Sequence, residues 1–168
     1  MIQPVKHVVR FEGGNALPAF RAAALLARLQ GVCERLAGIE ARHAYWVWSE
    51  APLDRAARDR LAALLDEGEP PLPAGHGDAA ALVVAPRLGT VSPWASKATD
   101  IAHNCGLTLK RVERVTEFRL THKTGLLGGS KPLSADERTA CAALLHDRMT
   151  ESVQIGRASC RERVCCKV

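Results

Sequence analysis

The sequence lacks any apolar run close to the ~18–20 residues that would be needed to cross a bilayer. Residues 1–12 carry charge in their middle and contain no apolar segment followed by a small-residue cleavage site, so no secretory signal is predicted. We therefore expect no membrane partner and a cytoplasmic location.

The sequence also contains no Cys-x-x-Cys pair and no set of cysteines and histidines at zinc-ligand spacing, so no metal site is predicted. Cys33, Cys105 and Cys141 lie far apart in apolar surroundings. That placement is typical of small buried side chains in a reducing compartment, and we expect all three to be buried.

Basic charge is sparse outside the carboxyl-terminal tail. Residues 155–168 supply +3 of the formal net charge of +5, which leaves +2 for residues 1–154. A nucleic-acid-binding surface needs a dense basic face that neutralises phosphates and releases counterions. We therefore expect no nucleic-acid partner.

The tail itself differs from the rest of the chain. Residues 155–165 show neither helical nor strand periodicity, and they resemble the translation of a common sequencing adapter. We predict that residues 1–153 form the domain and that residues 154–168 are a non-native tail, with a natural basic tail as the alternative.

The remaining chain alternates strand-like and helix-like segments. Strands are predicted at 5–11, 43–48, 79–85 and 112–121, with Gly13-Gly14-Asn15 ending the first. Helices are predicted from Pro18 to Gly38, from the cap Asp54 to Gly68, from the cap Ser92 to Gly106, and after a capping box at Ser134–Glu137. Residues 69–78 and 122–132 are predicted to be loops. Four strand–helix pairs indicate an α/β or α+β fold, and they permit a diverged duplication.

No segment carries a complete catalytic pattern. Residues 125–131 approximate a phosphate-binding loop, but Ser130 stands in place of its second glycine and Pro132 in place of its hydroxyl residue. His103 and Cys105 diverge on a helix, as do His146 and Asp147, so neither pair predicts a nucleophile with its base. We predict no catalytic, cofactor-binding or metal-binding residue.

The third predicted helix has the one polar cluster with a possible binding role. Its members, gathered around the helix start, are Arg87, Ser92, Trp94, Ser96, Lys97 and Thr99. Free N–H groups and the helix dipole favour anions there, although capping and solvation explain the cluster equally well. Trp46, Trp48 and Trp94 are predicted to fill the core or an interface.

Residues 86–107 contain Pro-Trp, Lys-Ala-Thr-Asp and His-Asn-Cys-Gly in close succession. This segment resembles a signature of the large, single-chain form of phosphoribosylformylglycinamidine synthase. Weaker similarity occurs at 19–28, 111–114 and 145–151, so the resemblance spans about residues 16–153, the amino-terminal domain of that family. Val115, where the family usually has glycine, and the longer loop at 122–131 depart from it.

The resemblance implies a function for the whole enzyme: conversion of formylglycinamide ribonucleotide to formylglycinamidine ribonucleotide with glutamine and ATP. A glutaminase domain releases ammonia, and a synthetase domain uses ATP and Mg²⁺. The family's residues for those steps match no position of this chain, so ATP and Mg²⁺ are expected only in the full-length enzyme.

The resemblance also implies a fold and a role. The family's first domain is similar to a dimer of a small ferredoxin-like subunit, so we expect an α+β fold with an antiparallel or mixed sheet backed by helices. The expected partners are the synthetase and glutaminase domains of its own full-length chain, with the helix at 92–104 as part of the contact. The alternative is a free-standing regulatory module that binds a small molecule or anion.

Overall fold

The computed structural model describes residues 7–69, 80–123 and 132–155. Five strands and four helices follow one another along these residues. In chain order they are β1 (His7–Asn15), α1 (Ala19–Gln30), β2 (Leu36–Ser49), α2 (Arg55–Leu65), β3 (Ala80–Pro86), α3 (Pro93–Asn104), β4 (Arg111–His122), α4 (Ala135–Leu145) and β5 (Glu151–Ile155). The predicted α+β fold is confirmed.

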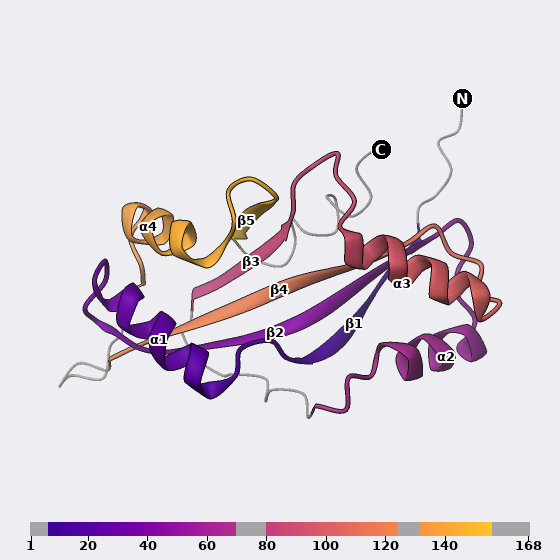
Figure 1. Cartoon of the computed structure of the whole chain (residues 1–168), viewed down its shortest axis with the longest axis horizontal. Coiled ribbons are helices and arrows are strands. Elements are labelled where there is room, and N and C mark those ends of the chain that lie inside the picture. The colour runs from indigo at the N-terminus through magenta and orange to yellow at the C-terminus, as the bar shows by residue number, and fades with distance from the viewer. Residues whose placement is uncertain (1–6, 70–79, 124–131, 156–168) are drawn as a thin grey trace.

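The strands form one antiparallel sheet in the order β1-β2-β4-β3-β5. β2 and β4 lie at its centre and pair from Leu36 opposite His122 to Trp48 opposite Arg111. Side chains alternate between the faces of a strand, and the core residues Ile39, Ala41 and Val47 of β2 share one face. All four helices cover that face, with α1 and α4 at one end and α2 and α3 at the other (Figure 1).

The element order contains an internal repeat. The series β1-α1-β2-α2 is followed by β3-α3-β4-α4, and the sheet order β1-β2-β4-β3 is symmetric about the boundary between β2 and β4. This arrangement agrees with the duplicated unit that the family resemblance implies.

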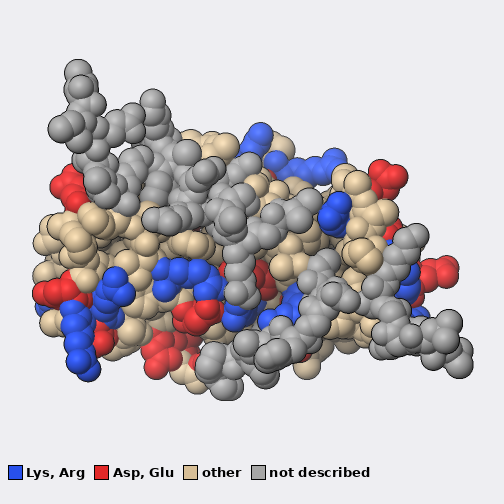
Figure 2. Space-filling view, turned by 180° about the vertical axis from the view of Figure 1, so that it is seen from behind, with Lys and Arg blue, Asp and Glu red and all other residues tan. Residues whose placement is uncertain are grey.

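The other face of the sheet has a small apolar cluster and a network of charges. Ala44, Trp46, Val83, Ala85 and Val115 form the cluster, so Trp46 and Val115 are both buried. Beside the cluster, two arginines hold one carboxylate. Arg10 and Arg42 donate to Glu117 at 2.9 and 3.0 Å. Acidic and basic side chains are intermingled in the view from behind (Figure 2).

Local capping chemistry starts three helices where the sequence predicts. The Asp54 carboxylate accepts a hydrogen bond from the Ala57 N–H at 2.7 Å, and the Ser92 hydroxyl accepts one from the Ala95 N–H at 3.0 Å. At α4 both bonds of the predicted capping box between Ser134 and Glu137 are present. Each cap supplies a partner for an N–H group that a helix cannot satisfy itself.

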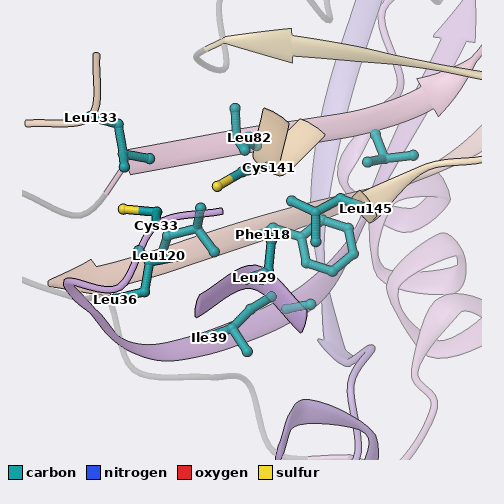
Figure 3. Close-up of a cluster of buried hydrophobic side chains, with 12 residues drawn as sticks. Leu29, Cys33, Leu36, Ile39, Leu82, Phe118, Leu120, Leu133, Cys141 and Leu145 are labelled. Carbon is teal, nitrogen blue, oxygen red and sulfur yellow. The ribbon is translucent and has the colours of Figure 1, made fainter. Parts of the chain in front are cut away.

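The first predicted helix is too long. α1 ends at Gln30 rather than near Gly38, because the chain turns at Gly31 and Leu36 already opens β2. Leu36 recurs at helical spacing in the sequence, but it is fully buried in the core beneath α1 and α4 (Figure 3). Pairing with β4 also extends β2 well beyond the predicted 43–48. Similarly, α2 ends at Leu65, three residues before Gly68.

Two strand predictions are also wrong. β1 continues through Gly13 and Gly14, which the sequence predicts as a break. A Cβ on Gly13 would lie 2.7 Å from the His43 carbonyl oxygen, so the missing side chain permits close packing on β2. The sequence does not predict β5, which pairs with the outer edge of β3 and extends to Ile155, past the predicted domain boundary at residue 153.

Two of the three cysteine predictions are confirmed. Cys33 and Cys141 are buried in the core cluster (Figure 3). Cys105 is exposed. α3 turns Ala95 and Ala102 toward the sheet, and Ile101 is 45% exposed. Cys105 comes directly after the last residue of α3 and lies outside the packed face.

Residues 70–79, 124–131 and 156–168 are outside the described part. Most of the two predicted loops, the phosphate-loop-like segment at 125–131 and most of the predicted tail lie there. Within the described ranges, none of the helices is both long and apolar enough to span a bilayer.

Candidate interdomain contact surface

An apolar groove of about 390 Å³ lies between α2 and α3, above the central strands. Its walls include Leu61 and Leu64 from α2 and Ala98 and Ile101 from α3. Leu64 is 43% exposed and Ile101 is 45% exposed. Each helix therefore contributes one large, partly exposed apolar side chain to the same depression.

The floor of the groove is an aromatic pair. Tyr45 of β2 stacks on Trp94 of α3 with ring centroids 5.5 Å apart and an interplanar angle of 22°. The Arg114 guanidinium lies 4.9 Å from the Trp94 ring centroid, so a cation–π contact adds to the stack. Such contacts contribute about 0.5–1.5 kcal/mol beyond simple burial, and here they fix the start of α3 on the sheet.

Charged side chains also border the groove. Glu67 and Lys97 both line the groove, and Glu67 forms an ion pair with Arg114 at 3.6 Å. Burial raises the pKa of the Tyr45 phenol, and the nearby Glu67 carboxylate raises it further. Burial also lowers the pKa of His43, with the positive charge of Arg114 as a second cause. The Tyr45 phenol therefore stays protonated at pH 7.

The start of α3 already contains a carboxylate. The Ser92 hydroxyl, which caps α3, donates to Glu113 Oε1 at 2.9 Å. Glu113 is 1% exposed and forms an ion pair with Arg111. This internal carboxylate lies near the free N–H groups at the start of α3, where the sequence suggested that an external anion could bind.

The six predicted site residues do not converge on one point. Trp94 and Lys97 line the groove. Thr99 accepts a hydrogen bond from the Val112 N–H at 3.0 Å and so joins α3 to β4. Arg87 donates to the Met149 carbonyl at 3.3 Å, and the exposed Ser96 donates to the Ser92 carbonyl at 3.5 Å. Most of the cluster therefore holds α3 and its flanking turns in position.

The two histidine pairs have structural contacts. His103 Nε2 lies 2.8 Å from the Leu109 carbonyl oxygen, and Asp147 Oδ2 accepts from the Thr150 hydroxyl at 3.0 Å. Among residues 7–69, 80–123 and 132–155, no group of three or more histidine, cysteine, aspartate or glutamate side chains could hold a metal ion.

Sequence reasoning missed most of the groove. Leu61, Leu64 and Leu65 fall within the helix predicted from Asp54 to Gly68, and Tyr45 and Arg114 fall within predicted strands, but none of them was predicted as a site residue. The helical spacing of the three leucines was the available signal. Whether such a face is covered depends on where the neighbouring helix lies, and only the fold decides that.

The chain is thus an α+β domain with an apolar groove between two of its helices. The chain belongs to the family described as formylglycinamide ribonucleotide amidotransferase N-terminal, whose model matches residues 42–162. The match covers well over half of the chain and confirms the predicted family. It is the amino-terminal domain of a purine-biosynthetic ligase that uses an amidotransferase reaction, and it forms part of a larger chain.

The matched range includes both helices of the groove. It begins inside β2, so the similarity noted at 19–28 lies before it, and it ends beyond β5. The range also extends past residue 153, where we predict the non-native tail to begin. That boundary stays a prediction.

Proposed function

We propose that this domain is a packing element of formylglycinamide ribonucleotide amidotransferase, which holds the synthetase and glutaminase domains in their working arrangement. One observation carries the proposal: in a domain that belongs to a larger chain, Leu64 and Ile101 expose apolar surface on both sides of a preformed groove.

The energetics favour a packing role. Burying a leucine or isoleucine side chain completely contributes about 1.5–3 kcal/mol, so covering the exposed part of each residue contributes about 1 kcal/mol. The Tyr45–Trp94 stack and the Thr99 hydrogen bond hold α3 rigidly, which lowers the entropy cost of association.

In this proposal the chemistry belongs to the other domains. Ammonia release takes place in the glutaminase domain, while ATP and Mg²⁺ act in the synthetase domain. The present domain supplies no reacting group, and the chain alone is expected to be inactive.

The test is association in trans with the synthetase–glutaminase region of the enzyme, followed by sedimentation velocity. The variant Leu64→Asp/Ile101→Asp places two charges in the groove and is expected to weaken association by about 10- to 100-fold, which corresponds to about 1.4–2.8 kcal/mol. Leu88→Asp is the matched control, because Leu88 is 55% exposed but lies outside the groove.

Equal association of the double variant and the wild-type chain would exclude the groove as the contact. Titration with ATP and ribonucleotides separates this proposal from a free-standing ligand-binding module, and we expect no saturable binding. Measurable amidation of the substrate by the chain alone would overturn the packing role.

A further inference from the structure

A second groove, of about 450 Å³, lies between α1 and α4 at the other end of the helical layer. Its apolar lining includes Leu25 of α1, Val84 of β3, Phe118 of β4 and Leu144 of α4. Unlike the groove between α2 and α3, it is bordered along one side by two arginines, Arg21 and Arg28.

The two arginines have a defined spacing. They are seven residues apart on α1, which places their Cα atoms about 10.5 Å apart on nearly the same side of the helix. Both are exposed, and α1 contains no acidic residue. Within the described residues, neither arginine forms an ion pair.

Among the described residues, Glu151 is the one acidic residue that lines this groove, and it is already engaged. Glu151 Oε2 accepts a hydrogen bond from the Asp147 N–H at 2.9 Å, at the turn that leads into β5. Beside Arg21, the Phe20 side chain is 76% exposed and adds apolar surface to α1. The surface thus combines an apolar depression with two unpaired positive charges.

We propose that the groove between α1 and α4 binds an amphipathic helix of a protein partner that presents apolar side chains between two carboxylates seven residues apart. Arginine is suited to carboxylates because its planar guanidinium can donate two parallel hydrogen bonds. The apolar side chains would fill the depression, as in other helix-in-groove complexes. The proposal concerns a different surface from the α2–α3 groove and does not depend on it.

The probe is a fluorescein-labelled, alanine-based helical peptide with two glutamates seven residues apart and two leucines between them. Its binding to the full chain is measured by fluorescence anisotropy. We expect saturable binding that weakens with added salt, and a loss of about tenfold or more in affinity in the variant Arg21→Glu/Arg28→Glu. Arg55→Glu/Arg60→Glu on α2 is the control with the same change in net charge, and it is expected to bind like the wild type.

Exchanging the charges of the protein and the peptide provides the most specific test. A peptide with lysines in place of the glutamates should bind the Arg21→Glu/Arg28→Glu variant better than it binds the wild type. Circular dichroism confirms that the variants are folded. Equal affinity of wild type and variant for the glutamate peptide would overturn the proposal. Self-association of the chain that the Arg21→Glu/Arg28→Glu change abolishes would also overturn it, because the occupant would then be a second copy.

Discussion

The two ends of the helical layer are built from the same kinds of elements but are held together differently. Beneath α1 and α4, twelve buried residues form a continuous core, whereas seven form the core beneath α2 and α3. At the larger core, a partly exposed ion pair between Arg35 and Glu137, at 2.6 Å, joins the loop before β2 to α4. At the smaller core, the buried Glu113 and the Tyr45–Trp94 stack fasten α3 to the sheet.

The difference shows that a repeated topology fixes where the helices lie but not which interactions hold them on the sheet. At the α1–α4 end, most stabilisation comes from buried apolar contacts. The α2–α3 end has fewer such contacts and depends more on specific polar and aromatic anchors. Three comparisons between the ends and one pH measurement at Glu137 test this conclusion.

The largest effect is expected from the anchoring carboxylates. Glu113→Ala should lower the free energy of unfolding by about 3–5 kcal/mol, because it leaves Arg111 without its partner in a buried position. Glu137→Ala at the other end should cost less, since the Glu137 side chain is 26% exposed and water can replace its contacts. Urea unfolding measures both. A larger loss for Glu137→Ala would reverse the comparison.

The next effect concerns the two cores. Leu29→Ala should destabilise the domain by about 2–5 kcal/mol, toward the upper part of that range, because Leu29 is fully enclosed. Leu61→Ala should lie near the lower limit, about 2 kcal/mol, since Leu61 borders a groove that neighbouring side chains can partly fill. Chemical denaturation of both variants measures which of them loses more unfolding free energy. Equal m-values would show that both variants unfold from similarly compact states. Equal losses would show that the two cores do not differ in this way.

Helix caps provide a smaller, matched comparison. Ser134→Ala should cost about 1–2 kcal/mol because it removes the hydroxyl that accepts from the Glu137 N–H in the capping box of α4, whereas Asp54→Ala should cost about 0.5–1 kcal/mol on α2. Thermal unfolding followed by circular dichroism can resolve the two. If Asp54→Ala proves the more costly, the Ser134 hydroxyl stabilises its helix less than the Asp54 carboxylate does.

The smallest effect is expected in the acid range. The Arg35 guanidinium, with the Ser134 N–H as second cause, lowers the pKa of Glu137 from 4.5 to about 2. Because the folded-state pKa is the lower one, this stabilisation is fully present above about pH 4.5 and is lost as the pH falls toward 2. The difference in melting temperature between the wild type and Glu137→Gln should therefore shrink over that range. A difference independent of pH would show that the charge of Glu137 contributes nothing.

Much of the fold could be predicted from local patterns. The starts of α2, α3 and α4 follow from Asp54, Ser92 and Ser134, because a capping side chain bonds to an N–H only two or three residues away. β3 was recognisable as a short apolar run. The candidate site was predicted less well: Trp94 and Lys97 line the groove, but Leu64 and Tyr45 were not singled out.

The sequence by itself determined the family, the α+β class and the helix starts, since these depend on neighbouring residues or on a contiguous motif. Only the tertiary structure decided the fate of Leu36, Gly13, Cys105 and the strand β5. Leu36 leaves its helical pattern to fill the core, and Gly13 stays in a strand because His43 packs closely against it. In each case the deciding contact comes from a segment distant in the sequence, and no local pattern contains that information.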